Sequence, residues 1–179
     1  MARDGAPIGS EQPAPLPHRP PHHRTGIGYD SHRLVPDRPL ILGGQRIPFE
    51  RGLSGHSDAD VVAHALTDAL LGAAAAGDIG ALFPDTDPRW KGADSIKLLA
   101  GACEHLRQAG YRPVQADVTV LLERPKLAPF ISAMTSTLAG AMGISQTAVS
   151  VKAKTNEGMG FIGRGEGIAA IAVATVEAI

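Results

Sequence analysis

The chain has 179 residues and a formal net charge of −1 at neutral pH, with 20% of its residues charged. This length is enough for one well-buried core, and the balanced charge argues against a nucleic-acid or membrane-surface protein. No apolar run is long enough to span a bilayer. The single cysteine, Cys103, excludes an intrachain disulfide and indicates a reducing, cytoplasmic setting. Its position in a helical run favours a buried thiol over a nucleophile.

Residues 1–24 differ from the rest of the chain because they are rich in proline, histidine and arginine and hold few large aliphatic side chains. We expect a disordered tail there, because such a segment cannot bury enough apolar surface to order itself. It also lacks the pattern of a secretory signal. His22 and His23 could bind a stray metal ion, but a solvated tail is the simpler interpretation. Residues 25–179 are expected to form a single domain.

The rest of the chain alternates between strand and helix patterns. Alternating and buried apolar runs predict strands over residues 25–34, 114–122, 149–154 and 167–178. Apolar residues at helical spacing predict helices over residues 57–76, 93–109 and 128–142, each followed by a glycine. Gly43-Gly44 is typical of the tight turn of a hairpin, here over residues 39–48. We therefore expect an α+β two-layer sandwich, with helices packed on one face of a mixed β-sheet.

Asp30, His32 and His64 are the strongest candidates for a metal site. Asp30 and His32 are two residues apart on a predicted strand, so their side chains point to the same face. His64 comes from the following helix, near the edge of its apolar stripe. One carboxylate and two imidazoles give three ligands and leave the fourth position open on zinc or a similar ion. An isolated Asp-x-His often arises by chance, so this interpretation depends on the neighbouring motifs.

His56 and Ser57 directly precede the helix that carries His64. We expect this helix to begin at Ser57-Asp58-Ala59-Asp60, with a capping residue and acidic residues in its first turn. Because a helix N-terminus offers unpaired N–H groups and a partial positive charge, His56 and Ser57 could contact a phosphate beside the metal. The alternative is simple capping by Ser57, with His56 exposed to solvent.

Thr155-Asn156-Glu157 directly precede a glycine-rich stretch, residues 158–167, between the last two predicted strands, and Arg164 lies within this stretch. A carboxylate such as Glu157 can hold Mg²⁺ or Mn²⁺ together with phosphate oxygens, although Glu157 alone could also be an ordinary surface acid. The planar fork of Arg164 suits an oxyanion. The chain has no P-loop, Rossmann or G-x-S-x-G motif. A substrate that carries its own phosphate nucleophile would need only alignment and charge stabilisation from the protein.

Several long stretches of the chain resemble one known family. They are GIGYDSHRL, GGQRIPFERGLSGHSDADVVAHALTDALLGAAAAGDIGALFPDTDP, KGADS and KTNEGMGFIGRGEG. In order and spacing they are similar to the 2-C-methyl-D-erythritol 2,4-cyclodiphosphate synthase family of the non-mevalonate isoprenoid pathway, over residues 25–179. The resemblance implies a homotrimer with active sites between subunits. It also implies that the 2-phosphate of 4-diphosphocytidyl-2-C-methyl-D-erythritol 2-phosphate attacks the β-phosphorus and releases CMP.

The resemblance further implies roles for individual residues. It assigns zinc to Asp30, His32 and His64, a second divalent ion, Mg²⁺ or Mn²⁺, to Glu157, and transition-state stabilisation to His56 and Thr155. Implied substrate contacts are Asp30, Ser31, His32, His56, Ser57, Lys154, Thr155, Asn156, Glu157, Phe161 and Arg164. Implied contacts to the methylerythritol portion are Asp78, Ile79, Gly80, Phe83, Pro84, Asp85, Thr86 and Asp87. The implied cytidine pocket is Leu122, Glu123, Arg124, Pro125, Lys126, Leu127 and Ala128. Arg164 and Glu166 correspond to positions near the trimer axis, where some members hold an isoprenoid diphosphate.

Two other functions remain open from the residues alone. A metal-dependent phosphohydrolase would use the same ligands, with metal-bound hydroxide as the nucleophile. A zinc-stabilised binding module, such as an isoprenoid-diphosphate sensor, would hold zinc without turnover. Removal of a structural zinc should melt the fold, whereas removal of a catalytic zinc should abolish turnover and leave the core folded.

Overall fold

The structure, a computed structural model, describes residues 22–179, so most of the predicted tail lies outside the described residues. His23 and Arg24, which we assigned to the tail, belong instead to the first strand, β1 (His23–Pro36), and pair with the last strand. The strand begins two residues earlier than predicted because Arg24 has partners. Its guanidinium donates to the carbonyl of Ala74 at 3.3 Å and to the hydroxyl of Tyr111 at 3.1 Å.

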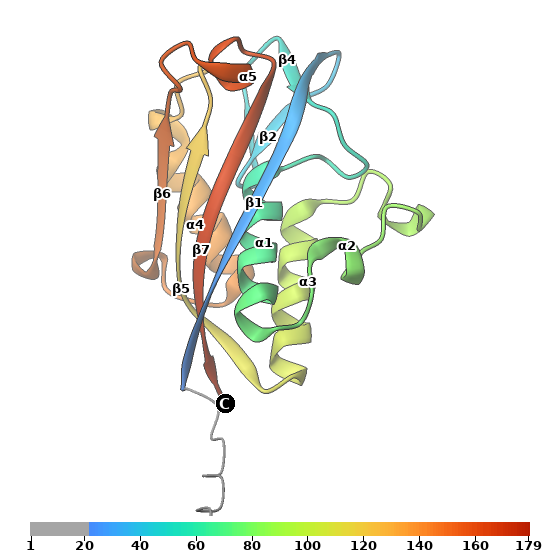
Figure 1. Cartoon of the computed structure of the whole chain (residues 1–179), viewed down its shortest axis with the longest axis vertical. Coiled ribbons are helices and arrows are strands. Elements are labelled where there is room, and N and C mark those ends of the chain that lie inside the picture. Colours follow the sequence, from blue (N-terminus) through green and yellow to red (C-terminus); the bar gives the residue numbers. More distant parts are fainter. Residues whose placement is uncertain (1–21) are drawn as a thin grey trace, which may run out of the picture.

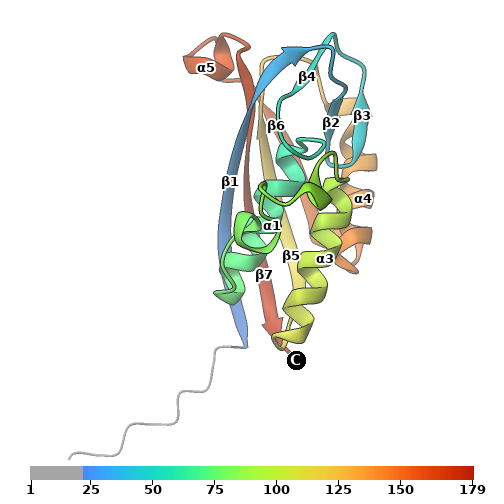
Figure 2. The same ribbon diagram turned by 90° about the vertical axis from the view of Figure 1, so that its right-hand side faces the viewer.

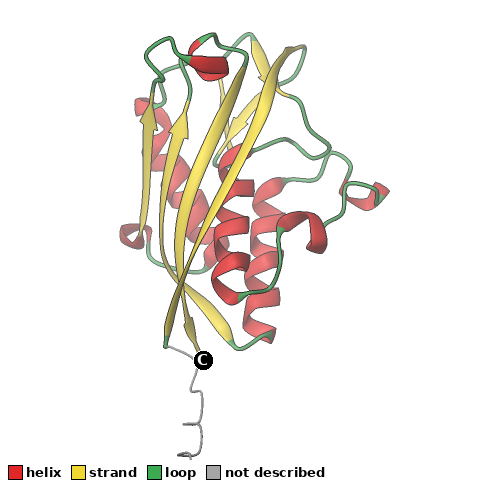
Figure 3. Cartoon of the chain, in the orientation of Figure 1, coloured by secondary structure: helices red, strands yellow, loops and turns green. Residues whose placement is uncertain are grey.

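A five-stranded sheet forms one layer of the molecule (Figure 3). In spatial order its strands are β4 (Arg51–Leu53), β1, β7 (Gly167–Ala178), β5 (Tyr111–Leu121) and β6 (Val149–Lys154). β7 runs antiparallel to both β1 and β5, whereas β5 and β6 are parallel. The predicted mixed sheet is confirmed. β6 and β7 also have the bounds that the sequence predicts, because their ends are marked by clear turn and glycine signals.

Three long helices form the second layer, and all of them lie on the same face of the sheet (Figures 1 and 2). They are α1 (Val61–Ala74), α3 (Ser95–Gln108) and α4 (Ile131–Met142). α1 packs on β1 and β7, α4 packs on β6, and α3 contacts both α1 and α4. The α+β architecture with helices on one sheet face is therefore confirmed.

Several short elements are absent from the sequence prediction because they hold too few residues to show a periodicity. They are β4, α2 (Ile79–Leu82), α5 (Gly160–Gly163) and the 3₁₀ helices η1 (Pro88–Trp90), η2 (Ala128–Phe130) and η3 (Gln146–Ala148). The predicted helix over residues 128–142 thus begins as a 3₁₀ turn and becomes an α-helix at Ile131. α5 lies inside the glycine-rich stretch, at the end of the sheet (Figure 1).

The predicted hairpin forms a separate two-stranded sheet, β2 (Leu40–Leu42) and β3 (Gln45–Ile47), which turns at Gly43 and Gly44 with φ of 56° and 73°. The fully buried Asp60 ties this turn to α1. Its carboxylate accepts from the N–H groups of Gly43 and Gly44, at 2.8 and 2.6 Å, and from the first free amides of the helix, Val62 and Ala63. Burial raises the pKa of Asp60 to about 6, against the effect of these amide bonds.

Asp60 rather than Ser57 is therefore the N-cap of α1, and the predicted start of this helix is wrong. The helix begins at Val61, and its first turn holds no acidic residue. A buried carboxylate needs several donors, and only the helix amides and the hairpin turn supply them here. His56 and Ser57 consequently lie in the preceding loop and do not face unpaired helix amides.

β1 and α1 approach each other with almost no side chains between their backbones. A Cβ atom at Gly28 would lie 1.9 Å from the carbonyl oxygen of Ala65, and one at Gly26 would lie 2.2 Å from that of Ala69. Only glycine allows such contact, because any other residue would push the helix away. This close packing sets the distance between His64 on α1 and the residues of β1 that follow Gly28.

Candidate metal centre and its pocket

Asp30, His32 and His64 form a compact cluster between β1 and α1. An oxygen of Asp30 (Oδ2) lies 3.0 Å from Nε2 of His32 and 2.9 Å from Nδ1 of His64, and these two nitrogens are 3.2 Å apart. All three side chains are largely buried, with 13–23% of their surface exposed. Within residues 22–179 no other group of three acidic, histidine or cysteine side chains could hold a metal ion. The three residues predicted from the sequence therefore lie close enough together to bind one metal ion.

The electrostatics of this cluster favour an ionised carboxylate. Burial alone would raise the pKa of Asp30, but the hydrogen bonds and charges of His32 and His64 outweigh it and hold this pKa well below its usual range. Burial alone would lower the pKa of His64, but the hydrogen bond and charge of Asp30 outweigh it and raise this pKa. The cluster thus contains an ionised carboxylate, and its negative charge is balanced by a cation or a protonated imidazole beside it.

The donor set fits zinc. Tetrahedral zinc holds nitrogen and oxygen ligands at about 2.0–2.2 Å, which places neighbouring ligand atoms about 3.3 Å apart. The three candidate ligand atoms lie 2.9–3.2 Å apart, close to one triangular face of such a tetrahedron. Three protein ligands leave the fourth position for a substrate atom, which is typical of catalytic rather than structural zinc sites.

A pocket of about 620 Å³ opens beside the cluster. It brings together residues from six separate segments of the chain, and its lining comprises His32, Gly55, His56, Ser57, His64, Ile79, Gly80, Phe83, Pro84, Asp85, Thr86, Trp90 and Leu98. His32 and His64 of the metal cluster, the His56–Ser57 loop and most of the predicted methylerythritol segment therefore share one cavity. Its volume is that of a typical small-molecule site.

The loop that carries His56 is held from both sides. Arg38 donates to the carbonyl oxygens of Gly55 and Ser57, both at 2.9 Å, and the carbonyl of His56 accepts from the N–H of Gly92 at 2.8 Å. The His56 side chain itself is exposed at the pocket. These bonds fix the backbone of an otherwise irregular loop, so His56 has a defined position without help from the helix N-terminus.

Two of the predicted contacts, Asp78 and Asp87, are not among the residues that line this pocket. Asp78 caps α2 by accepting from the N–H of Ala81 at 2.8 Å, and Asp87 caps η1 and pairs with Arg89 at 2.6 Å. Both carboxylates therefore cap short helices of this loop. The sequence could not separate these roles, because capping and ligand-binding acids look the same in a polar loop.

Thr155 and Glu157 lie on a different part of the molecule, beyond the end of β6. Thr155 donates from its hydroxyl to Glu157 at 2.6 Å, and the backbone of Glu157 is left-handed, with φ of 51°. A single oxygen of Glu123 accepts from the N–H groups of Asn156 and Gly158, at 2.8 and 3.2 Å. Glu123, predicted as a cytidine contact, thus holds the loop on both sides of Glu157.

The register of the sheet separates this loop from the metal cluster. Asp30 on β1 pairs with Ala170 on β7, Ala170 pairs with Val120 on β5, and Val120 pairs with Ala153 on β6. Three strand spacings of 4.7–4.9 Å place Ala153 about 14 Å from Asp30. Thr155 and Glu157 follow Ala153, so within one chain they do not reach the cluster.

The predicted cytidine segment follows β5 on the same side as Glu157. Leu122 and Leu127 are buried in the hydrophobic core, so these two side chains pack the fold. Arg124 and Lys126 are exposed. The segment therefore offers its backbone and polar side chains to solvent.

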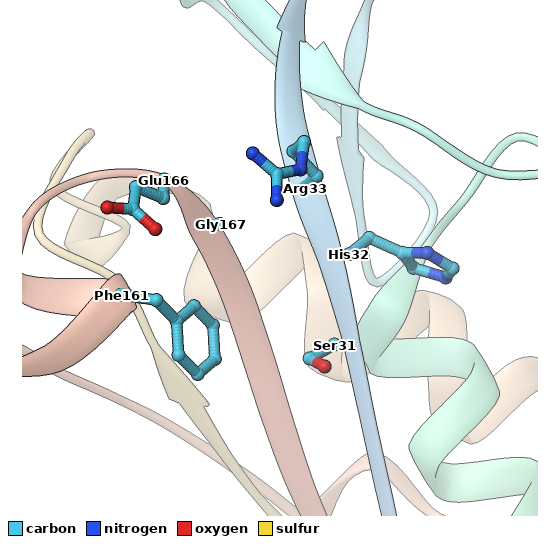
Figure 4. Close-up of a pocket in the computed structure, with 6 residues that line it drawn as sticks. All are labelled: Ser31, His32, Arg33, Phe161, Glu166 and Gly167. Atoms are coloured by element: carbon cyan, nitrogen blue, oxygen red, sulfur yellow. The ribbon is translucent and has the colours of Figure 1, made fainter.

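Ser31, Phe161 and Glu166 lie near the glycine-rich loop, in a second pocket of about 280 Å³ (Figure 4). His32 points to the side of the helices, whereas Arg33 points toward Glu166 (Figure 4). Arg164 donates to Glu166 at 2.6 Å. Ser31 is thus on the open face of the sheet and does not line the cavity that His56 and Ser57 share.

Sequence reasoning missed four residues that build this site: Arg38, Asp58, Trp90 and Ser95. Arg38 holds the His56 loop, Trp90 lines the pocket and stacks edge-on against Phe83, and Asp58 and Ser95 lie behind His64. The only signal was that Asp58 and Ser95 lie within stretches that resemble the known family. It pointed to the family rather than to a contact.

The chain was compared with known proteins. A model described as the YgbB family matches residues 23–177. The chain is 59% identical over 154 residues to 2-C-methyl-D-erythritol 2,4-cyclodiphosphate synthase of Salinibacter ruber, covering 86% of this chain and 98% of that protein. It is also 59% identical over 151 residues to the enzyme of the same name from Symbiobacterium thermophilum, covering 84% and 96%. A solved structure of a 2C-methyl-D-erythritol-2,4-cyclodiphosphate synthase in its CDP-bound form aligns with a TM-score of 0.79 and 43% identity, covering 86% of this chain and all of that one. None of the helices within residues 22–179 has the length and apolar character needed to cross a membrane.

Proposed function

The chain belongs to the YgbB family of 2-C-methyl-D-erythritol 2,4-cyclodiphosphate synthases, and from this premise we propose how its residues carry out the reaction. It is a phosphorus–oxygen lyase that converts 4-diphosphocytidyl-2-C-methyl-D-erythritol 2-phosphate to 2-C-methyl-D-erythritol 2,4-cyclodiphosphate. A bond forms between an oxygen of the 2-phosphate and the β-phosphorus. The bond from the β-phosphorus to the oxygen of CMP breaks, and CMP leaves with that oxygen and its electron pair. The observation that carries the proposal is the triangle of Asp30, His32 and His64, whose two histidines line the 620 Å³ pocket.

Asp30, His32 and His64 hold zinc in this proposal. When bound there, zinc would polarise a phosphoryl oxygen and offset the negative charge on the oxygens of the attacked phosphoryl group. By holding zinc at a fixed place beside the pocket, the three residues would orient the phosphate that zinc contacts. The support is the fit of their ligand atoms to one face of a tetrahedron.

His56 and Thr155 stabilise the transition state, and Glu157 holds Mg²⁺ or Mn²⁺ against the diphosphate. His56 is supported by its rigid loop at the pocket, and Ser57 beside it contacts the diphosphate. The roles of Thr155 and Glu157 are supported by the hydrogen bond between them and by the hydrogen bond that Glu123 accepts from the backbone of their loop. Since the attack occurs within one substrate molecule, alignment is the main demand, and good alignment is worth about 7–11 kcal/mol of barrier.

The pocket residues Ile79, Gly80, Phe83, Pro84, Asp85 and Thr86 hold the methylerythritol portion, supported by their shared cavity. The exposed part of the segment from Leu122 to Ala128, with Lys154, Asn156 and Phe161, receives the cytidine side of the substrate. A solved relative in a CDP-bound form, at 43% identity, supports a nucleotide site in this fold.

A complete active site in this proposal needs two copies of the chain. The metal half lies at β1 and the Glu157 half lies at β6, about 14 Å apart across the sheet. A neighbour that presents its β6 end to the β1 side of this chain would join the two halves. Such a contact uses different surfaces on the two partners, and it closes into a ring when the rotation fits. We propose a homotrimer with one site at each contact.

The open face of the sheet supports this assembly. It exposes large apolar side chains at Ile27 (70%), Tyr29 (55%), Ile171 (37%) and Val173 (41%). A contiguous apolar surface of this kind marks an interface, because water contact with it is unfavourable. Beside the glycine-rich stretch, a pocket of about 210 Å³ is lined by Arg51, Arg124 and Arg164. With Glu166 beside Arg164, this pocket supports binding of an isoprenoid diphosphate near the trimer axis.

Complementation between two inactive variants tests the composite site. His64→Ala removes a metal ligand and Glu157→Gln removes the second-ion ligand, so each homotrimer should lose activity. In trimers formed from equal amounts of both chains, about a quarter of the contacts join an intact metal half to an intact Glu157 half. We expect co-expressed variants to regain about a quarter of wild-type CMP release. Mixed trimers that stay inactive, or a wild-type chain that is fully active as a monomer, would contradict the composite site.

Labelled water separates this reaction from hydrolysis. Cyclisation uses an oxygen of the substrate itself, so products formed in ¹⁸O-water should carry no label. A metal-dependent phosphohydrolase would place one labelled oxygen in its phosphate product. Removal of zinc by a chelator should stop CMP release and leave the circular dichroism spectrum unchanged. A collapse of the fold on chelation would instead indicate a structural zinc.

A further inference from the structure

The side of His64 that faces away from the metal cluster contacts a buried polar network. Nε2 of His64 lies 2.8 Å from the hydroxyl of Ser95 and 3.1 Å from that of Ser57. Ser95 is 1% exposed and Ser57 is 8% exposed. Unpaired polar groups at such depth are costly, so the protons of this network must be arranged consistently.

Asp58 decides where the hydroxyl proton of Ser95 points. The backbone N–H of Ser95 donates to one oxygen of Asp58 at 3.1 Å, and the hydroxyl of Ser95 donates to the other in a short hydrogen bond. The N–H of Asp60 donates to that second oxygen at 3.2 Å, which fixes the carboxylate further. Because a carboxylate accepts only, the proton of Ser95 is committed to Asp58, and the lone pairs of Ser95 face His64 and Ser57.

Ser57 fits the same arrangement. Its oxygen accepts from the N–H of Ala59 at 3.1 Å and lies 3.3 Å from the oxygen of Ser95, to which it can donate. Every polar atom is then satisfied if Nε2 of His64 carries a hydrogen and donates it to Ser95. Nδ1 of His64, the atom that lies 2.9 Å from Asp30, then has its lone pair free.

We propose that Asp58 and Ser95 are positioning residues that accept the Nε2 hydrogen of His64 and thereby hold its Nδ1 lone pair toward the metal. This inference rests on the proposed zinc site. Metal-binding histidines commonly donate their second N–H to an oriented acceptor, and loss of that acceptor typically costs about 10- to 100-fold in metal affinity. Here the acceptor is a serine whose own orientation is fixed by an aspartate 37 residues away in sequence.

Zinc affinity, measured by competition with a chelating dye, tests the proposal. We expect Ser95→Ala and Asp58→Asn each to weaken zinc binding by about 10- to 100-fold. Ser57→Ala is the matched control, because it removes the other hydroxyl near Nε2 and leaves Ser95 and Asp58 in place; its zinc affinity should stay within about threefold of wild type. Ser95→Thr keeps the hydroxyl and should bind zinc as wild type does.

Two further readouts separate positioning from general damage. Asp58 acts through Ser95, so Asp58→Asn should cost little more in the Ser95→Ala background, in a double-mutant cycle. In zinc-loaded protein with ¹⁵N-labelled histidine, the ring N–H of His64 should give a slowly exchanging signal that Ser95→Ala abolishes and Ser57→Ala retains. Circular dichroism and thermal melting report whether each variant is folded.

The outcomes distinguish this inference from the proposed function. If the wild type binds zinc and Ser95→Ala binds it equally well, or if the two losses add fully, the positioning role is wrong and the zinc site stands. If the active wild-type protein binds no zinc, the zinc site itself is wrong. Loss of zinc affinity in Ser95→Ala, with rescue in Ser95→Thr, supports both.

Discussion

Replacement of Gly28 by alanine tests whether the close contact between β1 and α1 determines the distance between His64 and the other two metal-binding residues. The added Cβ would lie 1.9 Å from the carbonyl oxygen of Ala65 and 2.7 Å from the N–H nitrogen of Ala69. Both neighbours are backbone atoms, so the helix as a whole must retreat by about 1.5 Å to restore ordinary packing distances. Such overpacking costs about 1–3 kcal/mol of unfolding free energy.

His64 moves with the helix, whereas Asp30 and His32 stay with the strand. Ligand distances at a zinc site vary by only about 0.2 Å, so a shift of about 1.5 Å breaks the coordination triangle. We therefore expect Gly28→Ala to lose at least about tenfold in zinc affinity, as well as stability. Urea denaturation followed by circular dichroism and a zinc competition assay measure the two effects.

Gly72→Ala is the matched control on the same helix. Its added Cβ would lie no closer than 3.9 Å to the nearest atom, the carbonyl oxygen of Ile27. Because alanine is the better helix former, this change should stabilise the protein by about 0.5–1 kcal/mol and leave zinc binding intact. A Gly28→Ala protein with wild-type stability and zinc affinity would refute the reasoning.

Glu123, Arg38 and Cys103 allow three further tests. Glu123→Ala should slow CMP release about tenfold and leave zinc affinity unchanged, because the Thr155–Glu157 loop loses the two hydrogen bonds that its backbone N–H groups donate to Glu123. Glu123→Gln keeps an accepting oxygen and should stay active. An equal loss of activity in both variants would contradict this role. Arg38→Met should lower kcat by about tenfold, because the His56 loop loses the two hydrogen bonds that Arg38 donates to its carbonyl oxygens. Arg38→Lys should have an intermediate kcat. Unchanged kinetics in Arg38→Met would exclude a positioning role. Cys103 is fully buried and burial raises its pKa to about 11, so at pH 8 its thiol should resist a disulfide reagent until denaturant unfolds the chain; rapid labelling of the folded protein would count against this.

Sequence patterns predicted the long elements of this fold well, for identifiable reasons. β7 is almost entirely alanine, isoleucine and valine between a glycine and the end of the chain, so its bounds are unambiguous. The start of α1 was misplaced because Ser57, Asp58 and Asp60 are all good caps. Only the tertiary contact of Asp60 with the turn at Gly43 and Gly44 selects between them.

The candidate site was predictable as a list of residues and not as a geometry. The Asp-x-His spacing placed Asp30 and His32 on one face, because strand alternation is local, and the neighbouring motifs made a metal site the favoured interpretation. The strand order is not local, so nothing in the sequence places Glu157 three strands away from Asp30. Arg38, Asp58 and Ser95 were missed because serine, arginine and aspartate in loops usually meet solvent.

The pairing of Asp30, through Ala170 and Val120, with Ala153 has a pharmacological consequence. If the two halves of each catalytic centre meet only when separate polypeptides associate, turnover requires association as well as substrate. A compound that lodges against Ile27, Tyr29 and Val173 and keeps the polypeptides apart would silence every centre at once. It would need no metal-chelating group, and its potency would fall as the enzyme becomes more concentrated.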